Sequence, residues 1–237
     1  MIKFFEKFET IICILLIVFY IVINSYCMQN FNTTDYRTVI INTCFSIFLI
    51  GLIICLKRLK YYGFRKVKNK KEYLYFIPLI LLVFANLFNG ININNTREEI
   101  IYHILTMINI GFIEEIIFRG FLFKMMEKED LKIAITVNTI TFGIGHIINL
   151  FNGADLIPTL IQVVYAMCGG YMFVMLFYKS KSIIPCIITH SLINALSIFN
   201  IENEFSIYII PIYLIIVSLL YGIYISKKVE VNKEIEE

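Results

Sequence analysis

The chain has 237 residues, of which 59% are hydrophobic, whereas soluble domains usually contain about 45–50% apolar residues. Only 16% of the residues are charged, and the mean hydropathy is +0.77. A soluble protein of this length has no interior large enough for so much apolar surface, so the composition predicts an integral membrane protein. The net charge of +3 is too small to indicate a nucleic-acid partner.

Apolar runs of about 20 residues, separated by polar clusters, predict an all-α, polytopic membrane helix bundle. We expect about eight transmembrane helices in a single membrane domain, residues 1–237. Pro78 and Pro211 lie inside expected spans and are expected to kink them. The expected spans are 9–28, 38–56, 73–89, 99–125, 132–150, 157–178, 183–200 and 206–226.

The distribution of basic residues predicts the orientation of the chain. If the N-terminus is cytoplasmic, the outer segments hold only Arg37 and Arg97, and Arg119 lies within a span. Every other Lys and Arg then falls in or beside a cytoplasmic segment, as the positive-inside rule requires. We therefore expect a multi-pass protein with cytoplasmic N- and C-termini. The basic stretch Lys57–Lys71 is interpreted as a loop that sets this topology, in preference to a patch for anionic lipids.

Three formal charges, on Glu114, Glu115 and Arg119, lie within the expected span 99–125, where each costs about 2.5–3.5 kcal/mol to insert. Glu115 and Arg119 are four residues apart on one helix face, with the glutamate first, which predicts a buried ion pair. Glu114 is turned by about 100° from Glu115, so we expect it to face a cavity. His103 lies about 16 Å from Glu114 along the axis and is expected outside the site.

Two later spans carry polar side chains that can join Glu114. Phe142 and His146 are four residues apart, and so are His190 and Asn194, so each pair shares one helix face. Because these residues lie at similar depths, we expect one carboxylate, two imidazoles and one amide to converge between the fourth, fifth and seventh spans. Each residue alone is equally consistent with a packing role, whereas the four together favour a functional site.

Two kinds of hydrolytic chemistry suit this set. A carboxylate beside an imidazole can take a proton from water, and a second imidazole with an amide can stabilise an oxyanion. Alternatively, Glu114, His146 and His190 are the ligand set of a catalytic divalent metal such as zinc. The sequence contains neither HExxH, typical of zinc proteases, nor GxSxG, typical of serine hydrolases. The residues leave both alternatives, and hence the cofactor, open.

The heptapeptide EEIIFRG, which begins at Glu114, resembles the EExxxR motif of the CPBP intramembrane proteases, the CAAX protease and bacteriocin-processing (Abi) family. FGIGH, which ends at His146, is similar to the family's FxxxH motif, and HSLIN, from His190 to Asn194, is similar to its HxxxN motif. The three motifs occur in the family's order on separate expected spans. The family core corresponds to about residues 75–200, and the first two spans correspond to an N-terminal addition.

This resemblance implies an eight-span helical fold and an intramembrane endopeptidase that hydrolyses a peptide bond of a membrane-associated peptide or protein. It implies that Glu114 and His146 activate the water, and that His190 and Asn194 bind the oxyanion. The family has been described both as metalloproteases and as glutamic proteases, so the resemblance leaves the metal open. The residues implied to support the site are Glu115, Arg119 and Phe142.

A competing interpretation is a non-catalytic membrane immunity or scaffold protein of the same fold, for example one that confers bacteriocin self-immunity. The intact motifs favour the enzyme, because a binding protein has no need for Glu114. A small transporter is a third alternative, but the sequence shows no inverted-repeat halves. Residue usage rich in Ile, Asn and Lys indicates a bacterial protein. We therefore expect a plasma-membrane protein that contacts lipid and acts on a peptide or protein substrate without a prenyl group.

Overall fold

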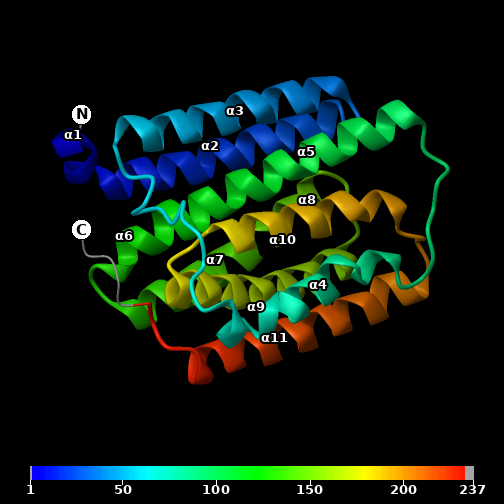
Figure 1. Ribbon diagram of the computed structural model, residues 1–237. Helices are drawn as coiled ribbons and strands as arrows, with labels where there is room; N and C mark the ends of the chain where they lie inside the picture. Colours follow the sequence, from blue (N-terminus) through cyan, green and yellow to red (C-terminus); the bar gives the residue numbers. More distant parts are fainter. Residues whose placement is uncertain (1, 233–237) are drawn as a thin grey trace.

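The computed structural model describes residues 2–232. Helices account for all the regular secondary structure of this part of the chain, which confirms the predicted all-α fold. The α-helices are α1 (Ile2–Lys7), α2 (Glu9–Asn30), α3 (Tyr36–Cys55), α4 (Ile77–Val83), α5 (Arg97–Glu115), α6 (Lys124–Glu127), α7 (Leu131–Gly145), α8 (Ile148–Phe151), α9 (Leu156–Ser180), α10 (Ile184–Ala195) and α11 (Ile210–Lys228). Figure 1 shows the long helices side by side in one bundle, with α2 and α3 on one flank and α4 and α11 on the other.

Within residues 2–232, six helical stretches are long and apolar enough to cross a membrane. Their outer surfaces carry large exposed apolar side chains, such as Leu15, Ile47 and Leu220, as lipid-facing helices do. The chain is therefore a multi-pass helical membrane protein, and these stretches agree with the expected spans to within a few residues. The six stretches are 9–30, 36–55, 97–127, 131–151, 156–180 and 205–228, and a shorter apolar helix covers 184–199.

The expected span 73–89 does not form one long transmembrane helix in the structure. Its only α-helix is α4, whose seven residues rise about 10 Å, far less than the roughly 30 Å of a hydrocarbon core. The φ angles of Leu74, Tyr75 and Phe76 are 50°, 50° and 63°, so a right-handed helix cannot pass through them. Pro78 lies in the first turn of α4, where its missing N–H breaks no helical hydrogen bond. The helix thus begins at this proline instead of being kinked by it.

The segment around α4 nevertheless follows the bundle from one end to the other (Figure 1). Asn86 Nδ2 donates a hydrogen bond to the carbonyl oxygen of Ile193 at 2.7 Å, and Asn89 Nδ2 donates to that of Ile201 at 3.1 Å. Such partners are necessary because non-helical backbone is tolerated at membrane depth only where the protein covers it. Pro211, which is also expected to kink a span, lies in the first turn of α11, inside the helical stretch 205–228 and directly after its π-helical segment Phe205–Ile209.

The central helix α5 continues through a π-helical segment, Ile116–Phe123, into α6, and it packs against α3 and α10. Gly111 permits the close approach of α5 to α10. A Cβ atom at Gly111 would lie 2.5 Å from Ser191 Oγ and 2.7 Å from the Ser191 backbone nitrogen. This contact holds the helix that carries Glu114 against the helix that carries His190.

The Gly111→Ala substitution should destabilise the protein, because the added methyl group meets backbone that cannot move aside without shifting α10. Overpacking of this kind costs about 1–3 kcal/mol. The matched control is Gly51→Ala in α3, where an added Cβ has nothing within 4 Å and alanine favours the helix by roughly 0.5–1 kcal/mol. Thermal unfolding in detergent measures both variants, and equal unfolding temperatures would contradict the close contact.

Candidate active site

The structure brings polar residues from α5, α7 and α10 around one cavity of about 360 Å³. Glu114, His146, His190 and Asn194 all line this cavity, together with Phe142. Glu114 and His190 are 8% and 7% exposed, so each reaches the cavity from an otherwise buried position. The four residues that the sequence places on three separate spans thus share one space inside the bundle.

Glu115 lies behind this cavity at the centre of a buried charge network. Its Oε1 atom accepts hydrogen bonds from Arg119 Nη1 at 3.0 Å and from His190 Nδ1 at 2.8 Å. Glu115 and Arg119 are both 0% exposed. Glu115 and Arg119 therefore form the ion pair expected from their spacing. Glu115 also bonds to His190 on another helix, a contact that the spacing along one helix cannot indicate.

Aromatic rings and one backbone carbonyl complete the surroundings of Arg119. Its guanidinium lies 4.1 Å from the ring centroid of Phe142 and 5.5 Å from that of Phe173. Its Nη2 atom donates to the carbonyl oxygen of Gly170 at 3.4 Å. A guanidinium over an aromatic face gains a cation–π attraction, which is strongest where water is excluded. Phe142 thereby links the charge network to the cavity that it also lines.

His190 stands between the two carboxylates. Its Nδ1 atom bonds to Glu115, and its Nε2 atom lies 3.5 Å from Glu114 Oε2. The imidazole stacks on Phe173, with ring centroids 5.8 Å apart and planes 25° apart. Because Glu115 accepts a bond at Nδ1, that nitrogen carries a proton and Nε2 is the atom presented to the cavity.

Tyr20 of α2 is a partner of Glu114 that the sequence analysis missed. It is buried, and its hydroxyl donates a hydrogen bond to Glu114 Oε1 at 2.5 Å. The first two spans were interpreted as an N-terminal addition to the site-bearing core. One signal was present in the sequence, since a tyrosine in the middle of an apolar span needs a hydrogen-bond partner for its hydroxyl.

The remaining histidines differ in their contacts. Within residues 2–232, no hydrogen bond joins His146 to Glu114, and the His146 ring instead meets Phe142 edge-on at 5.6 Å. His103 does not itself line this cavity, and its Nδ1 atom is 2.9 Å from Thr33 Oγ1. Its Nε2 atom is 3.3 Å from the carbonyl oxygen of Asn194 and 3.1 Å from the Oγ atom of Ser197, which lines the cavity.

A metal centre requires several ligand atoms around one point. The part of the chain that the structure describes contains no group of three His, Cys, Asp or Glu side chains arranged to hold a metal ion. Glu114, His146 and His190 share the cavity without forming such a set. The geometry therefore does not fit a three-ligand metal site at these residues.

Residues 96–196 match the model of a protein family described as Type II CAAX prenyl endopeptidase Rce1-like. This segment is Rce1-like. It extends from the N-cap of α5 to the end of α10 and contains all seven residues singled out from the three sequence motifs, which confirms the resemblance to the CPBP (Abi) proteases. No curated protein and no solved structure matches the chain. Tyr20 and α11 lie outside the Rce1-like segment.

Replacing Arg119 by alanine should strongly destabilise the fold, because Glu115 then keeps a buried charge without its cationic partner. Loss of one partner from a buried ion pair typically costs about 3–5 kcal/mol. Arg37→Ala is the matched control, since Arg37 pairs with Asp35 on the surface, where a side-chain exposure of 50% leaves the pair screened. Thermal unfolding should show a large decrease for Arg119→Ala and almost none for Arg37→Ala, and similar decreases would contradict the buried network.

Proposed function

We propose that this protein is an intramembrane endopeptidase that hydrolyses a peptide bond of a membrane-associated peptide or protein. The match of residues 96–196 to the Rce1-like endopeptidase family supports a protease. The observation that carries the proposal is the Glu114 carboxylate, which faces a cavity inside the bundle beside the two histidines and Asn194. A carboxylate inside a membrane costs free energy that a role in packing alone does not offset. A general base that activates water, by contrast, must lie beside the space that the water and the substrate occupy.

In the proposed reaction, Glu114 takes a proton from a water molecule held between Glu114 and His146. The water oxygen attacks the carbonyl carbon of the substrate peptide and forms a tetrahedral oxyanion. His190 Nε2 and the Asn194 amide donate hydrogen bonds to that oxyanion. The C–N bond then breaks, and Glu114 returns the proton to the leaving amine. The products are a carboxylic acid and an amine, and no metal takes part in any step.

The contact with Glu115 supports the role of His190 on the oxyanion side. That role requires the form of the ring in which Nδ1 donates to Glu115 and Nε2 carries the proton needed for the oxyanion. Glu115 thus acts as a positioning residue that orients the imidazole, in the manner of the carboxylates that hold catalytic histidines.

Tyr20 is proposed as a second positioning residue. Its hydroxyl donates a hydrogen bond to Glu114 Oε1, so Oε2 is the carboxylate oxygen available to water. Glu114 Oε2 lies 3.5 Å from His190 Nε2. Because Tyr20 lies on α2, we propose that the whole chain works as one membrane domain, in which the core of about residues 75–200 depends on the first span.

Glu114→Gln should abolish peptide hydrolysis, because the amide keeps the shape of the side chain and cannot accept the proton. Loss of a general base costs about 10²- to 10⁴-fold in rate. Peptide-library cleavage by the detergent-purified protein, followed by mass spectrometry, provides the measurement. Glu98→Gln is the matched control, since Glu98 lies on the same helix and is exposed. Its cleavage pattern should equal that of the wild type.

An unchanged cleavage pattern for Glu114→Gln would contradict the proposal and favour the immunity or scaffold alternative. The same assay tests the metal-free mechanism. Hydrolysis should persist after treatment with a strong chelator, and activity that disappears and then returns specifically with zinc would contradict that mechanism.

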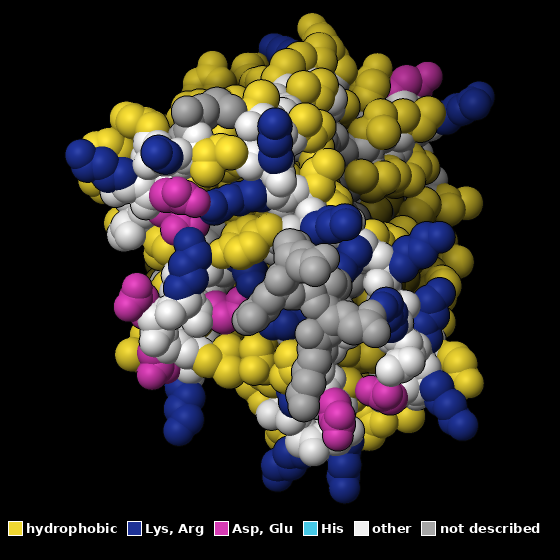
Figure 2. Space-filling model, turned by 60° about the vertical axis from the view of Figure 1, so that its left-hand side comes forward, with side chains coloured by type: hydrophobic (Ala, Val, Ile, Leu, Met, Phe, Trp, Pro, Cys, Tyr) yellow, Lys and Arg dark blue, Asp and Glu magenta, His cyan; other side chains and the backbone are white. Residues whose placement is uncertain are grey.

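We further propose that both termini face the cytoplasm of a bacterial cell and that the chain crosses the plasma membrane eight times. Figure 2 shows Lys and Arg side chains gathered over the end of the bundle that faces the left in Figure 1. The beginning of α1 and the end of α11 lie at this same end. Basic residues concentrate on the cytoplasmic side of membrane proteins. The eighth crossing is the segment around α4, whose short helix is followed by a 3₁₀-helical turn, Ala85–Leu87.

Reporter fusions test this orientation in bacterial cells. A fluorescent protein fused to the C-terminus should fluoresce, because it folds in the cytoplasm, and alkaline phosphatase fused there should be inactive. Alkaline phosphatase inserted after Asn94, in the loop before α5, should be active. The opposite pattern at either position would contradict the proposed orientation.

A further inference from the structure

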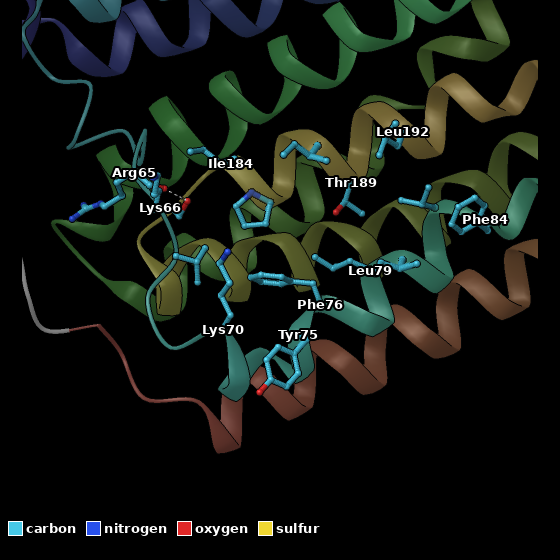
Figure 3. Close-up of a pocket in the computed structure, with 16 residues that line it drawn as sticks. Arg65, Lys66, Lys70, Tyr75, Phe76, Leu79, Phe84, Ile184, Thr189 and Leu192 are labelled. Carbon is cyan, nitrogen blue, oxygen red and sulfur yellow. Dashed lines mark hydrogen bonds between the residues drawn. The ribbon is translucent and has the colours of Figure 1, made fainter.

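A second hollow lies on the outer surface of the bundle, between α4 and α10 (Figure 3). Its volume is about 480 Å³, and its walls are almost entirely apolar. Leu79, Val83 and Phe84 form the side that belongs to α4 and its end, and Ile188 and Leu192 form the α10 side. The hollow thus runs between the side chains of α4 and those of α10. We call it the α4–α10 groove.

The α4–α10 groove is separate from the candidate active site. The two lie on opposite faces of α10, since Ile188 and Leu192 line the groove, whereas His190 and Asn194 line the cavity that holds Glu114. No residue lines both spaces. Whatever occupies the groove therefore contacts the back of the helix that carries two residues of the candidate site.

One end of the groove is basic. Arg65, Lys66 and Lys70 line it. Arg65 and Lys66 belong to the loop after α3, and Lys70 begins the 3₁₀-helical segment Lys70–Phe76 that precedes α4. Lys66 and Lys70 are exposed, and neither forms an ion pair within residues 2–232. In Figure 3 the side chain of Arg65 extends away from the apolar walls, whereas Lys70 reaches along the mouth of the groove beside Phe76. Two ammonium groups that have no ion pair with any described residue thus stand at the basic end of the α4–α10 groove.

We propose that the α4–α10 groove binds one anionic glycerophospholipid, with an acyl chain along the apolar walls and the phosphate headgroup at Lys66 and Lys70. The wall formed by α10 rises about 12 Å from Ile184 to Leu192, which is long enough to take a substantial part of one acyl chain. The basic end coincides with the proposed cytoplasmic surface, where bacterial and other membranes present anionic headgroups to protein. The groove thus gives Lys66 and Lys70 a role in lipid binding in addition to the topology signal for which the stretch Lys57–Lys71 is favoured from sequence alone.

The positive charges of Lys66 and Lys70, and not the apolar walls, favour an anionic phospholipid over other lipids. Lipid tails are as apolar as the groove, so an acyl chain gains little free energy by moving from the bilayer into it. Each lysine near an anionic surface favours binding by about 5-fold. Two lysines therefore predict a preference of roughly 20- to 30-fold for an anionic over a zwitterionic phospholipid with the same tails. This proposal concerns binding alone and does not depend on the proposed peptidase activity.

Native mass spectrometry of the detergent-purified full chain tests the proposal, with phosphatidylglycerol and phosphatidylcholine of identical acyl chains as probes. Phosphatidylglycerol should bind roughly 20- to 30-fold more tightly than phosphatidylcholine. The Lys66→Gln/Lys70→Gln double variant should lose most of this preference. The matched control is Lys3→Gln/Lys132→Gln, which removes two exposed lysines from the same end of the bundle and should keep the full preference.

A groove-filling variant, Leu192→Trp, checks the location of the acyl chain and should weaken binding of both phospholipids. Equal binding of the two phospholipids to the wild type would overturn the proposal. Equal losses in the two double-lysine variants would also overturn it, because they would indicate a general effect of surface charge. A dimer of the wild type that dissociates in Leu192→Trp would show that a second copy of the chain, and not a lipid, occupies the groove.

Discussion

The structure depends on one buried oxygen atom, Oε1 of Glu115. It accepts hydrogen bonds from Arg119 on its own helix and from His190 on α10. In a membrane interior such charges have no water to solvate them, so they must be satisfied within the protein. The two bonds therefore fix both the rotamer of Arg119 and the distance between α5 and α10. Gly111 makes that distance possible one turn earlier on α5, because its missing side chain leaves room for the backbone of α10 at Ser191.

The lengths of the spans could be predicted because one physical quantity, the thickness of the hydrocarbon core, sets them. The exception is the span 73–89, whose apolar composition is typical of a transmembrane helix. Its course depends on the left-handed conformations of Leu74, Tyr75 and Phe76 and on the amide of Asn86, which bonds to α10. Both are tertiary effects, since none of these residues requires such a conformation by its own chemistry.

In the candidate site, too, the contacts within one helix could be predicted from the sequence, whereas the contacts between helices could not. Helical periodicity places Glu115 beside Arg119, because residues four apart share a face, and it turns Glu114 in another direction. Periodicity has no information about neighbours on other helices. The contacts of Tyr20 with Glu114 and of His190 with Glu115 span 94 and 75 residues of sequence. The sequence could therefore supply the members of the site and one of its ion pairs, while its hydrogen-bond network required the packed bundle.

The end of α10 lies beside a polar cavity, where the α-helix passes into a 3₁₀-helical turn, Leu196–Phe199. The last carbonyl groups of a helix lack intrahelical partners, and at membrane depth no bulk water is present to satisfy them. Asn86 donates to the carbonyl of Ile193, and His103 lies 3.3 Å from that of Asn194. These contacts hold α10 at the turn where the Asn194 side chain enters the cavity. Polar residues outside the candidate site, Asn86 and His103, thus contribute to the hydrogen bonding at the end of the helix that carries His190 and Asn194.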